Sequence, residues 1–352
     1  MEDVIDWLLH GDPAIRWQAL EDLTDAPADE VATERARVEH EGWGARLLSL
    51  EGADGLWDGG ACFPAGYRGD EPGQPWTATM HTLQTLQLLG LDPGCEAARK
   101  AVARVAENGR WEHAGQHYFD GEVEPCINGR TIESGAYFGI DVSDIVERIV
   151  GERMADGGWN CEAETGSVRS SFDTTIDVLD GLVEFEQRTG GSPEVTEARR
   201  SGEEYLLERG LFRRKSTGEV VDPGYLGFAF PYYWHYDVLR ALDYFRRAGR
   251  EPDPRMQYLT ENTARARDHW REALASLAEI ERAGEPLAQL PEDLRAAGID
   301  EVLPRLGSDA IPYATAQAAT HLSEVVATIR DCEELVVAAR NRLVLQRSRD
   351  QP

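Results

Sequence analysis

Lysine is nearly absent from this chain. Among 352 residues only Lys100 and Lys215 are lysines, and the 64 Asp and Glu residues outnumber the 36 Lys and Arg residues, so the formal net charge is −28. A surface with this charge repels the phosphates of nucleic acids and the headgroups of anionic lipids. We therefore expect no nucleic-acid partner. A well-solvated surface explains the charge most simply, and an acidic face for a basic partner is the functional alternative.

Long apolar runs and paired cysteines are also missing. No stretch is long enough to span a bilayer, so no transmembrane segment is predicted, and the first residues lack the basic start of a signal peptide. The cysteines are scattered, odd in number and without a C-x-x-C pair: Cys62, Cys95, Cys126, Cys161 and Cys332. This pattern is typical of reduced thiols and predicts a cytoplasmic protein without a disulfide framework.

The chain does contain a recurring unit, which is clearest in residues 154–187. An Asp-Gly-Gly-Trp corner is followed there by a polar loop and an amphipathic helix that Ser170 or Ser171 can cap. The corner aromatic recurs at Trp57, Trp111, Trp159 and Phe212, which are 54, 48 and 53 residues apart. A period near fifty residues, filled by two helices and a loop, predicts repeated helical hairpins and an all-α protein.

Helix-start signals and apolar spacing predict the helices individually. They fall within residues 1–23 (two short helices), 27–39, 77–89, 96–107, 130–138, 142–153, 170–187, 193–208 and 233–247. One hairpin alone cannot bury both of its helices, so neighbouring hairpins must stack. A curved stack closes into a ring with one helix of each pair inside, whereas a straight stack is an open solenoid. Spacing alone does not separate these two arrangements.

Several ordered motifs carry a family resemblance. They are the corner DGGWNCE with its helix SSFDTTIDVLDGL, the pair GLW and PWTATMHTLQTLQLLGL, and the run FPYYWHYDVLRALDYF. These motifs resemble the repeats of the squalene cyclase and protein prenyltransferase β-subunit superfamily of terpenoid cyclases, most of all its bacterial squalene-cyclase-like proteins. The resemblance covers about residues 1–255. It implies an α/α toroid whose central apolar cavity holds an isoprenoid or another lipophilic small molecule.

The character of the chain changes after Pro254. The family's next corner and inner helix are absent, so the resemblance does not settle whether the toroid is complete. Residues 256–352 instead place apolar residues three and four apart, at 266–280 and at 322–343. This spacing predicts a helical hairpin or coiled-coil extension that pairs within the chain or across a homo-oligomer. The predicted domains are therefore 1–255 and 256–352.

Candidate acids follow from the resemblance. The family's cyclases protonate their substrate with an Asp of a D-x-D-D motif, and the matching positions here are residues 170–173, of which only Asp173 is an aspartate. Asp173 would act as an acid or, as is common for an Asp in a first turn, favour the helix dipole. His235 and Asp237 are further catalytic candidates at the start of the helix predicted for residues 233–247. A hydrogen-bonded structural histidine is the alternative for His235.

Metal ligands are the second hypothesis. The family's prenyltransferases hold zinc with Asp, Cys and His from successive inner-helix starts, which makes Cys126 and Cys161 candidate ligands here beside Asp173, His235 and Asp237. The family's Asp-x-Cys spacing is absent, and no set of these ligands is preferred. Zinc or magnesium is the implied ion.

Candidate substrate-binding residues lie in the loops and at the helix starts. The segment around residues 122–130 is dense in polar groups, which makes Glu124 and Arg130 candidate substrate-binding residues, and an arginine near a helix start can hold a diphosphate. His81 on the first inner helix either lines the cavity or pairs with another helix. Aromatic side chains could stabilise a carbocation through their faces or simply pack: Trp76, Phe172, Tyr232 and Tyr233. Three hypotheses follow: an isoprenoid-acting enzyme, a non-catalytic isoprenoid-binding protein, and a helical scaffold.

Overall fold

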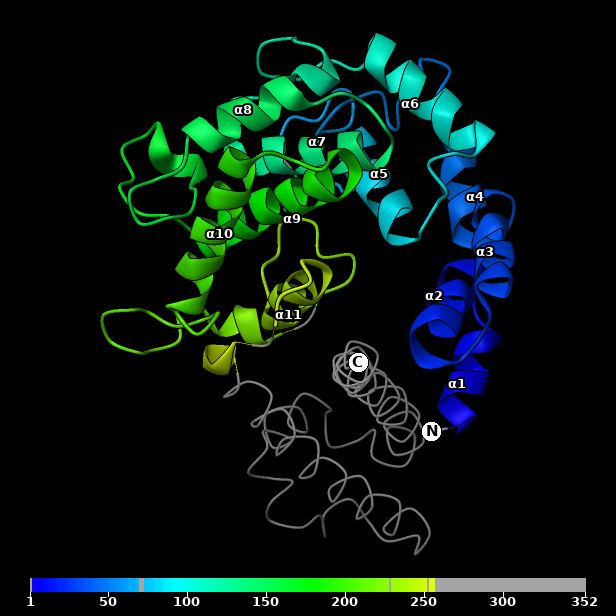
Figure 1. Cartoon of the computed structure of the whole chain (residues 1–352). Coiled ribbons are helices and arrows are strands. Elements are labelled where there is room, and N and C mark those ends of the chain that lie inside the picture. The colour runs from blue at the N-terminus through cyan, green and yellow to red at the C-terminus, as the bar shows by residue number, and fades with distance from the viewer. Residues whose placement is uncertain (1, 70–72, 228, 252, 257–352) are drawn as a thin grey trace, which may run out of the picture. The chain divides into compact units, whose positions relative to one another are not determined.

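The computed structural model describes residues 2–69, 73–227, 229–251 and 253–256, with side chains from residue 5 onward. The chain divides into two compact units, Met1–Asp253 and Pro254–Pro352. The eleven described α-helices all belong to the first unit (Figure 1). The apolar seams at 266–280 and 322–343, and with them the predicted C-terminal hairpin and its oligomer, lie outside the described residues.

The described part is helical and contains no β-strand, which confirms the all-α class. Two isolated bridges, Arg110 with His117 and Arg213 with Val220, are its only β-type pairings. The α-helices are α1 Glu2–Leu9, α2 Pro13–Leu23, α3 Ala28–Ala36, α4 Gly42–Ser49, α5 Thr79–Leu88, α6 Glu96–Asn108, α7 Pro125–Tyr137, α8 Ser143–Gly151, α9 Phe172–Thr189, α10 Pro193–Leu207 and α11 Val238–Arg247. The 3₁₀ turns are η1 Arg37–Glu39, η2 Tyr118–Asp120, η3 Cys161–Ala163, η4 Pro223–Leu226 and η5 Pro254–Met256.

Helix α4 was not predicted from the sequence, and two other helices begin elsewhere than predicted. Helix α7 begins at Pro125 instead of residue 130, because proline suits the first helical turn. The polar residues around Pro125 are typical of a loop, so the sequence did not indicate a helix there. Helix α11 begins at Val238 instead of residue 233, because the Asp237 side chain accepts a hydrogen bond from the Arg240 amide and thereby caps the helix there. At α9 the predicted serine cap is Ser171, which accepts from the Thr174 amide at 3.1 Å.

The helices of the hairpins form two layers. In the inner layer α5 packs on α7, α7 on α9, and α9 on α11, while in the outer layer α8 packs on α10 and both contact the inner helices (Figure 1). Outer helices bury one stripe, such as Ile145, Val146 and Ile149 of α8. Helix α7 is instead buried on every side, with Cys126 as its one partly exposed residue. The inner layer therefore has to satisfy polar side chains away from water.

The Gly-Trp corners connect the layers in a repeated way. The backbone amides of Trp57 and Trp159 each donate to a threonine at the following inner helix, Thr79 and Thr175, at 3.2 Å. Both indole N–H groups donate to a carbonyl of the preceding outer helix at 2.7 and 2.8 Å. The corner aromatics at 57, 111, 159 and 212 are all buried. At Trp57 and Trp159 the recurrence in the sequence is thus a recurrence of hydrogen bonds, whereas the Trp111 indole donates to the Tyr118 carbonyl of η2.

Helices α7 and α9 cross with their backbones in close approach. A methyl group on Gly129 would overlap the Asp177 carbonyl, and one on Gly181 would overlap the Gly129 carbonyl. Glycine is required at both positions because no side chain fits between the two backbones. This crossing sets the distance between the N-terminal ends of α7 and α9, where the candidate site lies.

Candidate metal centre at the inner-helix starts

Most predicted site residues lie at the N-terminal ends of α5, α7, α9 and α11 or in the loops before them. We call these segments the rim, and they comprise residues 74–81, 122–126, 160–161, 171–174, 225–227 and 229–237. Ring contacts join the rim segments, since Trp76 before α5 stacks on Tyr233 before α11 with centroids 4.8 Å apart. A hydrogen bond joins two further rim segments, since the Tyr225 hydroxyl donates to Asp173 at 2.7 Å.

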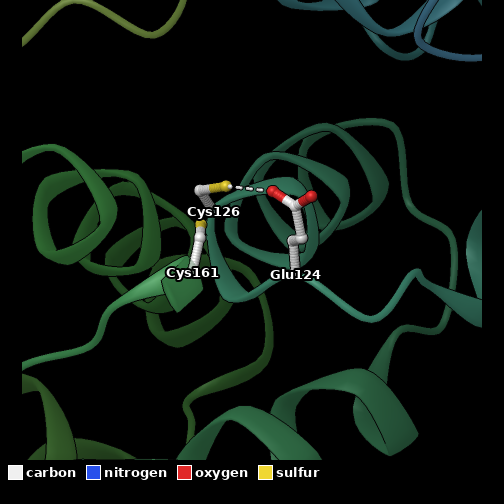
Figure 2. Close-up of side chains that lie close together, drawn as sticks. All are labelled: Glu124, Cys126 and Cys161. Atoms are coloured by element: carbon white, nitrogen blue, oxygen red, sulfur yellow. Dashed lines mark hydrogen bonds between the residues drawn. The ribbon is translucent and has the colours of Figure 1, made fainter. Parts of the chain in front are cut away.

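Three potential metal ligands converge at the rim (Figure 2). A carboxylate oxygen of Glu124 and the Sγ atoms of Cys126 and Cys161 all lie within 4.8 Å of one another. The Cys126 thiol donates to Glu124 Oε2 at 3.5 Å. Glu124 is exposed and the two cysteines are half-buried, so an ion and a further ligand can reach all three donors.

The local sequence explains how the two thiols are presented. Pro125 begins α7, which places Cys126 in its first turn beside the preceding Glu124. Asn160 accepts a hydrogen bond from the Glu162 amide at 2.9 Å and so starts η3 at Cys161.

Thr174, in the first turn of α9, fixes the orientation of Cys161. Its hydroxyl donates to Cys161 Sγ and accepts from the Cys161 amide, each at 3.3 Å. An outer hydrogen bond of this kind orients a metal ligand and is worth about 10- to 100-fold in metal affinity. Thr174 therefore belongs to the candidate site, although the sequence did not single it out.

The two thiols influence each other's protonation. The hydrogen bond from Cys126, assisted by Thr174, lowers the pKa of the Cys161 thiol against the opposing effect of burial. The same hydrogen bond, together with burial, raises the pKa of the Cys126 thiol. This hydrogen bonding favours the thiolate form at Cys161 over that at Cys126.

The donor set fits zinc better than magnesium. Zinc binds thiolates and carboxylates in tetrahedral sites, with bonds of about 2.0–2.3 Å and hence ligand atoms roughly 3.5–3.8 Å apart. The 3.5 Å separation of Cys126 Sγ and Glu124 Oε2 already matches that spacing. Magnesium prefers oxygen ligands, and two of these three donors are sulfur. Three protein ligands leave a fourth position, which is the arrangement of catalytic zinc sites.

Arg130 lies one helical turn after Cys126, among carboxylates of α7 and α9 and with the ring of Tyr232 against its guanidinium. It is 2% exposed. Its guanidinium donates to Glu133 at 2.7 Å, forms an ion pair with Asp177 of α9, and lies 3.4 Å from Asp180 of the same helix. Burial alone lowers the pKa of Arg130, but Asp177 and Glu133 more than reverse this, so its net pKa is raised and it stays charged.

Two arginines of α11 complete this buried group. Arg240 forms ion pairs with Asp177 and Asp180 at 2.6 and 2.9 Å, and Arg247 forms one with Asp180. We call these residues the ion-pair cluster: Arg130, Glu133, Asp177, Asp180, Arg240 and Arg247. Tyr232, a predicted substrate-binding residue, lies under the guanidinium groups of Arg130 and Arg240, 5.2 and 4.3 Å from its ring centroid. The cluster links α7, α9 and α11 directly below the candidate metal centre.

The three predicted catalytic residues do not come together. Asp173 accepts a hydrogen bond from the Tyr225 hydroxyl at 2.7 Å. Asp237 is 2% exposed and caps α11, and burial raises its pKa. His235 has Nε2 2.9 Å from the Gly227 carbonyl oxygen and 4.0 Å from Asp237. Each has a structural partner at the rim, and the group within ligand distance of one another is Glu124, Cys126 and Cys161.

The predicted aromatic residues form two separate groups. His81 is 1% exposed and lies edge-on to the rings of Trp76, Tyr233 and Trp234. Its Nε2 lies 3.0 Å from the amide nitrogen of Gln74.

Phe172 contacts a second set of rings farther along the rim: Tyr205, Tyr225 and Tyr236. Gln74 and Tyr225 were not predicted from the sequence, because Gln74 accepts from the indole of Trp234, 160 residues away, and Tyr225 donates to Asp173, 52 residues away. A polar hollow of about 370 Å³ lies elsewhere, between residues 155–157 and α10, and none of the predicted site residues lines it.

Comparisons with family models, curated proteins and solved structures found no match for this chain. In the part of the chain that the structure describes, no helix has both the length and the apolar character needed to cross a membrane.

Proposed function

We propose that this protein binds a zinc ion through Glu124, Cys126 and Cys161 and acts as a prenyltransferase-like enzyme on an isoprenoid chain. The observation that carries the proposal is the convergence of two thiols and a carboxylate within 4.8 Å, from segments 35 residues apart, at the start of α7 and in the 3₁₀ turn η3 that precedes α9. When bound in such a site, zinc lowers the pKa of a coordinated thiol or water and so makes it a nucleophile.

The residues of this chain would divide the work between holding the ion and holding the substrate. Thr174 orients the Cys161 sulfur, and Glu124 supplies the exposed third donor. The isoprenoid part of the proposal is supported by the motifs that resemble the terpenoid cyclase repeats and by the rim aromatics Trp76 and Tyr233. With it we propose the closed α/α toroid that the family would have, and a reducing cytoplasmic location that keeps the thiols free.

A non-catalytic helical scaffold is the second candidate, and the ion-pair cluster favours it. Charged side chains of α7, α9 and α11 meet in the inner layer, where Arg130, Asp177 and Asp180 are at most 2% exposed. Ion pairs in that place hold helices together but offer a hydrocarbon chain no apolar contact. A scaffold would keep this cluster and bind neither zinc nor isoprenoid.

Zinc titration of the full-length protein separates the two candidates. We expect Cys126→Ser and Cys161→Ser each to weaken zinc binding by more than about 100-fold, since even outer-shell changes cost 10- to 100-fold. Cys95→Ser is the matched control: that half-buried thiol accepts from the Ala98 amide at the start of α6 and should leave zinc affinity unchanged. Labelled farnesyl diphosphate, offered with a thiol acceptor, should then be converted by the zinc form alone. The proposal would be rejected if the parent protein bound zinc as weakly as the serine variants do. A parent protein that neither retained nor converted the isoprenoid would favour the scaffold.

A further inference from the structure

Two free thiols face each other at the rim, and that placement has a consequence for oxidation. Cys126 and Cys161 are both unpaired, both half-buried, and have sulfur atoms within 4.8 Å. They belong to different segments, α7 and η3, and the loop after η3 (residues 164–169) is largely exposed. A disulfide requires its sulfurs about 2.05 Å apart, so the two sulfur atoms have to move closer together before they bond.

We propose that Cys126 and Cys161 form a reversible disulfide when the protein meets a hydroperoxide. One cysteine sulfur attacks the peroxide oxygen, so that an S–O bond forms, the O–O bond breaks and an alcohol or water leaves with the proton. The second sulfur then attacks the first, so that the S–S bond forms, the S–O bond breaks and the hydroxyl leaves as water with the second thiol proton. The two thiols lose two electrons and the peroxide gains them.

The other described cysteines are placed differently. Cys62 is 4% exposed, and its sulfur lies 3.6 Å from the amide nitrogen of Gln74. Cys95 is half-buried, but its sulfur accepts from the Ala98 amide, and within the described residues no second thiol lies beside it. Cys332 lies outside the described residues. Cys95 therefore serves as an internal reference for a thiol of similar exposure without a partner.

The consequence for the rim is regulatory and rests on the proposed zinc function. A disulfide would consume both sulfur donors and leave Glu124 as the remaining ligand, so zinc and the disulfide exclude each other. Oxidation would thus switch the site off, and a thiol reductant would restore it. The disulfide itself needs no metal and is tested without one.

The test uses the full-length protein after chelation of metal, exposed to hydrogen peroxide and mapped by non-reducing peptide mass spectrometry. We expect a cross-link between the peptides that contain Cys126 and Cys161, whereas Cys95 should stop at the sulfenic acid, because only the Cys126–Cys161 pair has a second thiol in place to displace the hydroxyl. Dithiothreitol should reverse it. In Cys126→Ser, Cys161 should instead accumulate as a sulfenic acid that dimedone traps, and Cys95→Ser should retain the cross-link.

Oxidation of either cysteine to sulfinic acid without a cross-link, or a cross-link to another cysteine, would overturn the inference. The two proposals fail separately. A protein that binds zinc but forms no such cross-link keeps the proposed function and loses this inference, whereas one that cross-links and binds no zinc does the reverse. If both hold, zinc release should follow the cross-link with the same time course, measured with a colorimetric chelator.

Discussion

Replacing Arg130 by methionine should be among the most damaging single changes in the inner layer. The substitution keeps most of the apolar stem and removes the guanidinium that Glu133 and Asp177 contact. Removing one partner of a buried ion pair leaves uncompensated charge and costs about 3–5 kcal/mol of unfolding free energy. Arg240 still contacts Asp177, which places the expected loss nearer the lower figure.

The assay is urea-induced unfolding of the full-length protein, followed by far-UV circular dichroism and by tryptophan fluorescence. The two signals should coincide if a single free energy is to be derived. Arg37→Met is the matched control, because Arg37 is about half exposed where it pairs with Glu34 and Glu41. An exposed pair of this kind is worth at most about 1 kcal/mol.

A double-mutant cycle tests the contact itself. Arg130→Met leaves the Asp177 carboxylate without its partner, and Asp177→Asn removes that charge. The double variant should therefore lose about 1–3 kcal/mol less unfolding free energy than the two single variants lose together. If Arg130→Met cost no more than Arg37→Met, or if the two changes were additive within about 0.5 kcal/mol, the buried ion pair described here would be refuted.

Two further predictions concern the same layer. Burial lowers the pKa of His81 to about 4 from its ordinary 6.5, so the unfolded chain binds the proton more tightly than the folded protein does. About 3 kcal/mol of unfolding free energy is therefore lost as the pH falls from about 6.5 to about 4. Urea unfolding across that pH range should show this loss in the parent protein and lack it in His81→Gln. Gly129→Ala should lower the unfolding free energy by about 1–3 kcal/mol and weaken zinc binding, because the new methyl group overlaps the Asp177 carbonyl where α7 crosses α9. Gly151→Ala at the end of α8, where a methyl group meets nothing within 4 Å, is its control, and equal melting temperatures for the two variants would contradict the close crossing.

Sequence patterns predicted the helices well where their signals were local. Ser171 caps α9, and Asp12 and Pro13 start α2, because each of these helix starts depends on residues only a few positions apart. The predicted start of α7 was wrong, because the polar residues around Pro125 are typical of an exposed loop. They form a helix here because other parts of the fold supply partners for their polar groups. Propensity is overridden there by tertiary hydrogen bonds and ion pairs.

The candidate site was predictable only in part. Cys126 and Cys161 were candidate ligands, but their pairing with Glu124 depends on the close crossing of α7 and α9 at Gly129 and Gly181, which no local pattern reveals. Arg130 was predicted to bind substrate, yet its carboxylate partners on α9 lie 47 and 50 residues away in the sequence. Charge partners at such separations follow from the packing of helices and not from spacing along one of them.

X-ray absorption at the zinc edge of the full-length protein, purified under reducing conditions, tests the central claim most directly. Coordination by Cys126, Cys161 and Glu124 predicts two sulfur atoms at about 2.3 Å and oxygen or nitrogen atoms at about 2.0–2.2 Å. Cys161→Ser should lose one sulfur from that shell, while Cys95→Ser should keep both. A zinc shell without sulfur, or a sulfur count that is the same in Cys161→Ser as in the parent protein, would contradict the metal centre proposed here.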